Sequence, residues 1–512
     1  MSSCCVPPPP DQIDANIISI QLDFLKDNVP IHVGDPITCS HCNSIFSYLD
    51  KIENLSWKCK FCGTENKIAD VLPEELPDTQ TVDYILEAPV EQKTAETAED
   101  STLVYCIDTS GSMSINVDSN FGRMQTRLDV VKSALKSQIK ALSATKPNTK
   151  ICLVQFSKEV MIYGDCTEKP IVVKSQMLTD FDSLVDIAKE KVTLKSLSET
   201  KSSIYRAIDG LEEQGSTALG PALLVSSVIA GKQKNGKVIL CTDGMANVGI
   251  GILENGIDED KLYPRISELA KSYGVVININ TLSGCNAGLK DLGECSVATG
   301  GEVLVVEPSQ IETAFGDAID KVLIASEVVI GIYLHPAVCI DMEQNSESPS
   351  RKNVSYGNVT DGSIYQFKYA LRREEDIKVF GEIKNFPVQV QVKYKKTNGM
   401  KGIRVISKTI EVADEKEKDE LNGEVLQTYY IREASRQQAQ GNVFQARQNL
   451  SNFRMAQQVS TQTMQTPYME FANTMEYNFT HNTGDMSSAV RQQAAQINPA
   501  NVRRYNEYAK KK

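Results

Sequence analysis

The chain has 512 residues, of which 41% are hydrophobic, and a formal net charge of −12 at pH 7. A chain of this length normally forms more than one domain, and this hydrophobic content is sufficient for buried cores. The negative balance argues against nucleic acid as a general partner, because phosphate backbones are recognised by basic surfaces. The most apolar long stretch, residues 323–340, is interrupted by Glu327, His335 and Pro336, so we expect no segment that crosses a membrane.

The thirteen cysteines are odd in number and scattered along the chain. Cys106 and Cys241 fall within predicted central strands, where a free thiol acts as a small apolar side chain. This usage is typical of a reducing compartment, and the first residues lack the basic and apolar regions of a signal peptide. We therefore expect a cytoplasmic protein. The basic residues 501–512 leave a peripheral contact with a membrane or an acidic partner open.

Residues 1–35 begin with a proline-rich run and are expected to form a flexible N-terminus. Residues 36–70 then contain two C-x₂-C pairs, a spacing that predicts a zinc ribbon. The predicted ligands are Cys39, Cys42, Cys59 and Cys62. Four thiolates complete a tetrahedral shell and leave no open position, so the Zn²⁺ is expected to be structural and to supply folding energy that so short a segment cannot gain from a core. His41, inside the first pair, is an alternative ligand.

Residues 71–101 are rich in proline and acidic side chains and are expected to be a linker with one strand at 81–86. Over residues 102–325, near-continuous apolar runs alternate with amphipathic stretches. This alternation predicts a parallel sheet covered by helices on both faces, the doubly wound α/β (Rossmann-like) class. The expected strands are 102–107, 150–156, 237–242, 274–282 and 302–306, and the expected helices are 125–142, 261–273 and 309–324. Residues 165–214 are expected to be an insertion near the polar residues described next.

Five polar side chains lie where these strands should end. Asp108, Ser110 and Ser112 form a D-x-S-x-S motif after the first strand, Thr217 lies in a glycine-flanked loop, and Asp243 follows the strand at 237–242. The carboxyl ends of parallel strands meet at one edge of a sheet, and hydroxyl and carboxylate oxygens suit a hard, octahedral cation such as Mg²⁺. Because hydroxyls are neutral, the ion would stay electrophilic and could take a carboxylate from a partner. An ordinary capped, serine-rich turn is the alternative interpretation.

At these five positions the chain resembles a von Willebrand factor A domain with a metal-ion-dependent adhesion site. The resemblance implies direct contacts to the ion from Ser110, Ser112 and Thr217, and contacts largely through water from Asp108 and Asp243. The ion would be Mg²⁺, with Mn²⁺ or Ca²⁺ as alternatives. We expect the site to lie at the rim of the sheet, outside its core, so that replacing Asp108 by alanine removes partner binding and leaves the fold intact.

The β-rich segments of residues 326–411 are separated by polar turns and predict antiparallel strands in a β-sandwich. Residues 412–512 are expected to be a helical domain, with helices at 421–440 and 443–457 separated by Gly441-Asn442. The apolar faces that predict a helical hairpin comprise Leu426, Tyr430, Ala434, Phe444, Leu450 and Phe453.

The order of these modules resembles the COPII inner-coat subunits, the Sec-twenty-three/twenty-four family. The resemblance rests on residues 57–62 (WKCKFC), on Asn66 and on residues 80–84 (QTVDY). It implies a trunk of the A type, followed by a β-sandwich and a helical domain. Two departures are expected: that family ends with a gelsolin-like domain, for which this sequence leaves no room, and its trunk does not generally keep a complete ion site.

The sequence therefore predicts a non-enzymatic interaction scaffold, related to the trunk of vesicle coats, whose Mg²⁺ site binds an Asp or Glu of a protein partner. The alternative is a genuine COPII-type coat component that acts in vesicle transport at a membrane surface. An enzyme is disfavoured, because the sequence contains no G-x-S-x-G, no P-loop and no complete dinucleotide fingerprint, and its four histidines fall in no catalytic motif.

Overall fold

The computed structural model divides the chain into two compact units. The first unit comprises residues 1–91, 324–356 and 362–472, and the second comprises residues 92–323, 357–361 and 473–512. The structure describes residues 14–27, 29–68, 72–88, 101–118, 124–233, 235–254, 257–258, 260–282, 289–306, 311–320, 322–341, 348–380, 384–411, 422–439, 442–459, 469 and 472–473. The finer division into six segments stays a prediction, and the basic residues 501–512 lie outside the described part.

Within its described residues, the second unit is built on a seven-stranded sheet with the order β11-β10-β9-β6-β12-β15-β16. The strands are β6 (Thr102–Asp108), β9 (Lys150–Phe156), β10 (Val160–Gly164), β11 (Ile171–Val173), β12 (Lys237–Thr242), β15 (Val276–Leu282) and β16 (Val303–Val306). Neighbouring strands are parallel along the run β9-β6-β12-β15-β16, whereas β10 and β11 form an antiparallel edge beside β9. The predicted doubly wound class is confirmed.

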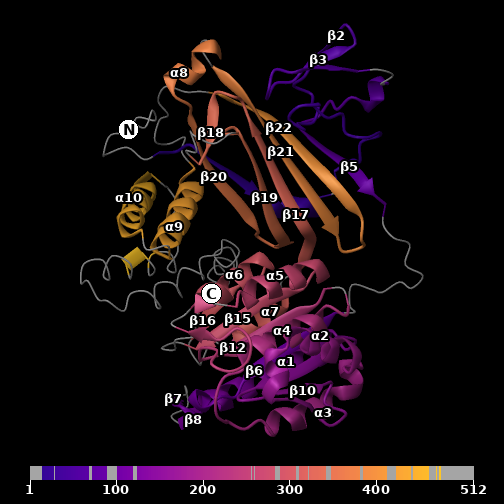
Figure 1. Ribbon diagram of the computed structural model, residues 1–512, viewed down its shortest axis with the longest axis vertical. Helices are drawn as coiled ribbons and strands as arrows, with labels where there is room; N and C mark the ends of the chain where they lie inside the picture. The colour runs from indigo at the N-terminus through magenta and orange to yellow at the C-terminus, as the bar shows by residue number, and fades with distance from the viewer. Residues whose placement is uncertain are drawn as a thin grey trace. The chain divides into compact units, whose positions relative to one another are not determined.

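Helices cover both faces of this sheet (Figure 1). One face packs against α2 (Phe181–Glu190), α4 (Leu219–Ala230), α5 (Leu262–Tyr273) and α6 (Leu289–Ala298), and the other against α1 (Arg127–Thr145), α3 (Leu197–Asp209) and α7 (Ile311–Asp320). Helix α1 buries Leu128, Val131, Leu135 and Ile139 at the spacing that predicted it. Two short hairpins complete the unit, β7 (Asn116–Asp118) with β8 (Met124–Thr126), and β13 (Leu253–Glu254) with β14 (Ile257–Asp258).

The stretch 165–214 is packed into the core of this unit, and its prediction as an insertion relative to the family stays a prediction. It supplies the edge strand β11 and the helices α2 and α3. Leu184 and Ile187 of α2 are buried against one face of the sheet, and Ile204 and Ile208 of α3 are buried against the other. Each helix buries one side, as amphipathic helices on a sheet do.

Besides the small three-stranded sheet of residues 52–67, the described part of the first unit contains two larger antiparallel sheets, ordered β19-β17-β21-β22-β5 and β1-β20-β18. Their strands are β1 (Ile17–Gln21), β5 (Thr81–Glu87), β17 (Leu323–Leu334), β18 (Val338–Ile340), β19 (Arg351–Thr360), β20 (Ile364–Leu371), β21 (Asn385–Lys396) and β22 (Lys401–Glu411), and a short helix, α8 (Glu374–Ile377), lies between β20 and β21. The predicted strand at 81–86 forms as β5 and pairs with β22 along the edge of the larger sheet.

Part of the stretch expected to be a flexible N-terminus is ordered, which corrects that expectation. β1 pairs with β20 over five residues, and a turn of 3₁₀ helix, Leu22–Lys26, follows it. Leu22 and Leu25 of that turn are buried. The stretch forms a strand because it pairs with β20, and the sheet that it completes, β1-β20-β18, is otherwise made of residues more than 300 positions farther along the chain.

The two predicted helices after the sandwich form as α9 (Gly423–Ala439) and α10 (Val443–Val459), which contact each other. Five of the six residues expected to form their apolar faces are buried, but Phe444 is 80% exposed. Phe444 lies in the first turn of α10, where the helix has just begun, and its burial was wrongly predicted. None of the helices in the described part of the chain is both long and apolar enough to span a membrane.

Candidate metal centres

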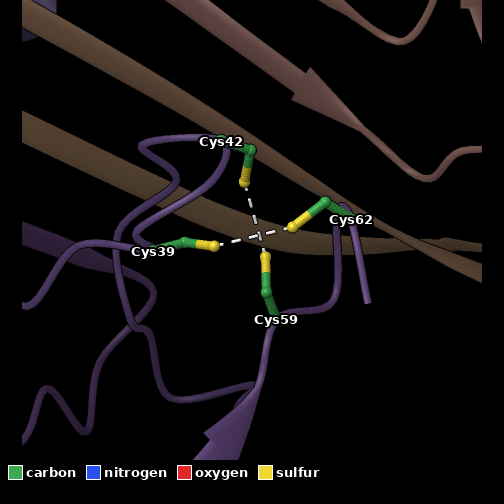
Figure 2. Close-up of side chains that lie close together, drawn as sticks. All are labelled: Cys39, Cys42, Cys59 and Cys62. Atoms are coloured by element: carbon green, nitrogen blue, oxygen red, sulfur yellow. Dashed lines mark hydrogen bonds between the residues drawn. The ribbon is translucent and has the colours of Figure 1, made fainter. Parts of the chain in front are cut away.

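The four predicted zinc ligands meet in the first unit, with their sulfur atoms all within 4.8 Å of one another. Figure 2 shows the four side chains pointing toward a common centre. The Sγ atoms of Cys39 and Cys62 are 3.5 Å apart, and those of Cys42 and Cys59 are 3.6 Å apart. A tetrahedral zinc ion with Zn–S bonds of about 2.3 Å separates its ligands by ~3.8 Å, so the donor set fits Zn²⁺.

Two matching turns hold these cysteines. Asn43 and Gly63 each follow the second cysteine of a pair with left-handed backbone, at φ of 61° and 75°. Their amides donate to the carbonyls of Cys39 and Cys59 at 3.0 and 2.9 Å. The turns tilt both thiols of each pair toward one point. The short strands β2 (Ile52–Glu53) and β3 (Ser56–Lys58) lie between the two turns in the chain, and β4 (Glu65–Lys67) follows the second turn and pairs with β3.

Polar and aromatic neighbours surround the thiols. The Ser44 hydroxyl lies 3.1 Å from the sulfurs of both Cys42 and Cys59, and Asn66 Nδ2 donates to Cys39 Sγ at 3.5 Å. The hydrogen bond from Cys59 lowers the pKa of Cys42 to about 4, and donating that bond raises the pKa of Cys59. One thiolate is therefore favoured before any metal binds, and binding of Zn²⁺ would release the remaining protons.

The ribbon is fixed to the larger sheet of the same unit. The side-chain amide of Gln389 in β21 accepts from the Ile45 amide at 2.8 Å and donates to the Ile45 carbonyl at 2.6 Å. Phe61 packs edge-on against Tyr333 of β17, with ring centroids 6.1 Å apart. The metal cluster is therefore continuous with the packing of the sheet.

In the second unit, the five predicted magnesium residues come together at the carboxyl ends of β6 and β12, which are neighbours in the sheet. The hydroxyls of Ser110 and Ser112 are 3.1 Å apart. Adjacent ligands of an octahedral Mg²⁺ with bonds of 2.0–2.1 Å lie ~2.9 Å apart, so two neighbouring positions suit these oxygens. Thr217 is held by its amide, which donates to Asn247 Oδ1 at 2.7 Å.

The residues with hydroxyls line a single cleft. Its volume is about 560 Å³, and its walls are Ser110, Gly111, Ser112, Gly215, Thr217, Gly244, Met245, Ala246, Asn247, Ile252 and Leu253. A Cβ atom on Gly244 would lie 3.6 Å from Thr217 Oγ1 and 3.7 Å from Ser112 Oγ. A side chain at this position would therefore touch both hydroxyls.

The two aspartates lie behind the hydroxyls. Asp108 Oδ1 accepts from the Ser110 amide at 2.8 Å, and Oδ2 accepts from the Thr242 hydroxyl at 2.6 Å. Asp108, Ser110, Thr217 and Asp243 are all buried, so the expectation that the site lies outside the core is wrong for these four residues. Burial, partly offset by these hydrogen bonds, raises the pKa of the Asp108 carboxyl to about 6. The carboxylate is still the main form at neutral pH and above.

Asp243 is held from both sides. Its Oδ1 accepts from Ser112 Oγ at 2.5 Å, and its Oδ2 accepts from Arg127 NH1 at 2.7 Å. Arg127 was not identified from the sequence, because it lies fifteen residues beyond Ser112 and belongs to no motif. Thr242 was also missed, although it directly precedes Asp243 and its hydroxyl orders Asp108.

No protein-family model matches the sequence. Circularly permutated Ras protein 1 of Dictyostelium discoideum is 31% identical over 429 residues, which are 78% of this chain and 50% of that protein. Protein transport protein SEC24-2 of Naumovozyma castellii is 24% identical over 301 residues, 52% of this chain and 32% of its own length. The chain thus spans half or less of the length of these relatives.

Among solved structures, the human COPII-coat protein Sec24c superposes with a TM-score of 0.55 over 91% of this chain and 68% of its own, at 14% identity. The chain shares the COPII-coat fold. That likeness, together with the observed elements, confirms the predicted resemblance: an A-type α/β domain, a four-cysteine ribbon, antiparallel sheets and C-terminal helices in one chain. At this identity the likeness concerns the fold alone.

Proposed function

We propose that this protein is a non-enzymatic interaction scaffold, related to the trunk of vesicle coats, that binds an acidic group of a protein partner through a divalent ion. The observation that supports this most directly is the convergence of Ser110, Ser112 and Thr217 on one cleft, with Asp108 and Asp243 buried behind them. In this proposal the three hydroxyls bind Mg²⁺ directly and the two carboxylates hold its waters.

Neutral inner ligands make the bound ion a strong acceptor of negative charge. Mg²⁺ prefers six oxygens and keeps several waters, so three hydroxyls leave positions that water or an incoming carboxylate can fill. An Asp or Glu side chain is the ligand class that matches a cation at the floor of an open cleft. Mn²⁺ and Ca²⁺ also accept oxygen ligands and would be alternatives at the same position.

A protein partner fits the surroundings of the cleft better than a small acid. The β7–β8 hairpin begins directly after the turn that carries Ser112 and ends where α1 begins. Ile115, at its base, is 48% exposed, and Met124, at the far end of the strand pairing, is 74% exposed. Exposed apolar side chains beside a charged centre are typical of an interface in which a central polar anchor is flanked by apolar contacts.

In the first unit, we propose a structural Zn²⁺ held by Cys39, Cys42, Cys59 and Cys62. Its role would be to keep the ribbon folded against β17 and β21, since the ribbon's own core is small. The shell would have no open position, and the ion would therefore take no part in binding.

The alternative function is a coat component at a membrane surface. It is favoured by the extent of the structural likeness to the COPII-coat protein, which covers most of this chain. Flotation with liposomes that contain anionic lipid would test it: a coat component should bind to them, whereas a scaffold without membrane contact should stay in the unbound fraction.

The main proposal is tested by capture of partners from extract of the source cells, in Mg²⁺ and in EDTA, with wild type, Asp108→Asn, Thr217→Ala and Ser114→Ala. Asp108→Asn keeps the shape of the buried side chain and should abolish capture, and Thr217→Ala should weaken it less. Ser114 lies in the same turn, but its hydroxyl donates to the Gly111 carbonyl at 2.7 Å, so its replacement is the matched control. Capture that is indifferent to EDTA and to Asp108→Asn would overturn the proposal.

A further inference from the structure

Arg127 is a cation built into the candidate magnesium site. Its side chain is 12% exposed and the Asp243 side chain is fully buried, and the two are joined by the 2.7 Å contact of NH1 with Oδ2. Ser112 Oγ donates to the other carboxylate oxygen at 2.5 Å. Both oxygens of Asp243 are therefore taken by groups of the protein itself.

The backbone of Arg127 is fixed as firmly as its side chain. Arg127 is the first residue of α1, and its amide donates to the Ile115 carbonyl at 3.0 Å. The preceding Thr126 forms a capping box with Asp129, and its hydroxyl donates to Glu213 at 3.1 Å. A capping box fixes the N-terminus of α1, so the position of the Arg127 backbone directs its guanidinium toward Asp243.

The charges of this group show what Arg127 does to ion binding. Counted as two carboxylates and one guanidinium, Asp108, Asp243 and Arg127 together carry one formal negative charge. Binding of Mg²⁺ turns this into one net positive charge, and a carboxylate from outside then makes the assembly neutral. Without Arg127, the loaded site would already be neutral, and an incoming carboxylate would leave it negative.

We propose that Arg127 competes with Mg²⁺ for Asp243 and thereby couples ion binding to the arrival of a carboxylate. This inference rests on the proposed function of the cleft and goes beyond it. Repulsion between the guanidinium and the ion lowers the affinity for Mg²⁺ alone. The ion and an anion attract each other, so each strengthens the binding of the other. The positive charge of Arg127 raises the affinity of the loaded site for the anion, so that this effect appears at a lower anion concentration.

The test is calorimetric titration of the full chain with Mg²⁺ at pH 8, in sodium chloride and in sodium acetate of equal ionic strength, with acetate as the carboxylate probe. Wild type should bind Mg²⁺ more tightly in acetate. Arg127→Gln should bind Mg²⁺ about tenfold more tightly than wild type in chloride and lose most of the acetate effect, a change within the usual range of coupling between sites. Arg127→Met keeps the aliphatic stem and should behave in the same way.

Lys140→Gln is the matched control, since it removes one positive charge from the same helix about 20 Å farther along at 1.5 Å per residue. It should titrate like wild type. If wild type binds Mg²⁺ and neither Arg127 variant binds it more tightly, the coupling is wrong and the proposed ion site stands. If Mg²⁺ binds to the Arg127 variants and not to wild type, the competition is supported. If it binds to none of them, both the coupling and the ion site are wrong.

Discussion

Replacing Arg404 should destabilise the first unit more than almost any other change on its sheets. Arg404 lies in β22 and is 1% exposed, and its partner Asp83 in β5 is 7% exposed. Nε and NH2 donate to the two carboxylate oxygens at 2.7 and 2.6 Å. The guanidinium also donates to the carbonyls of Phe24 and Asp27, so one side chain joins β22, β5 and the ordered N-terminal stretch.

Arg404→Met would leave the Asp83 carboxylate buried without its cation. Breaking a buried pair from one side typically costs about 3–5 kcal/mol, because the remaining charge is neither solvated nor paired. In a unit of this size each kcal/mol lowers the melting temperature by about 2–4 °C, so we expect a loss of roughly 6–20 °C. The double variant Arg404→Met/Asp83→Leu removes the stranded charge and should be less destabilised than Arg404→Met alone.

The assay is thermal unfolding followed by intrinsic fluorescence of Trp57, which is the single tryptophan of the chain and is buried in the ribbon of the same unit. Lys401→Met is the control, because Lys401 and Glu87 form an exposed ion pair between the same two strands at 3.0 Å. It should melt like wild type. If Arg404→Met also melts like wild type, or the double variant melts lower than Arg404→Met, the reasoning about a stranded charge is wrong.

Three other changes test separate parts of the structure. Cys59→Ser should lose the single equivalent of zinc expected in purified protein and shift Trp57 emission to the red, and full zinc content in that variant would refute the ligand set. Burial raises the pKa of Asp108 from 3.8 to about 6. Between these two pH values, the native state of the metal-free protein in EDTA therefore binds more protons than the unfolded state does. The free energy of unfolding should therefore fall by up to ~3 kcal/mol as the pH rises through this window. Asp108→Asn should remove that slope from unfolding curves measured by circular dichroism, and an unchanged slope would contradict it. Gly220→Ala would place a Cβ 2.1 Å from the Ile250 carbonyl oxygen and should destabilise the second unit by about 1–3 kcal/mol or more. Gly210→Ala meets nothing closer than 3.6 Å and is the control, and equal melting of the two variants would count against the close approach.

Features that depend on residues close together in the sequence could be predicted from it. The four cysteines specify their cluster because each C-x₂-C turn closes on itself, and the parallel strands show as uninterrupted apolar runs. Helix α4 gave no comparable signal, because all of its residues are buried and it has no polar face to reveal a helical period. The short edge strands β10 and β11 were missed because their pairing depends on neighbours in space.

The five residues of the candidate magnesium site could be named from the sequence, and their role as ion ligands stays a prediction, whereas Arg127 beside them was not identified. D-x-S-x-S fixed the turn, and Thr217 and Asp243 followed from their loops. The pairing of Arg127 with Asp243 joins residues 116 positions apart, and no periodic pattern encodes such a contact. The partners of β5 could not be predicted for the same reason, although the strand itself was.

The pairing of β5 with β22 has a consequence for synthesis of the chain. Asp83 and Arg404 are separated by 321 residues. At about 5–20 residues per second, β5 would leave the ribosome roughly 15–60 s before its neighbour exists. The seven-stranded sheet, within residues 102–306, is encoded between them and can form in that interval, while β1 and β5 remain without their neighbouring strands. Chaperone dependence should therefore concentrate in the N-terminal ninety or so residues, and truncation before β22 should leave aggregation-prone strands beside a folded α/β unit.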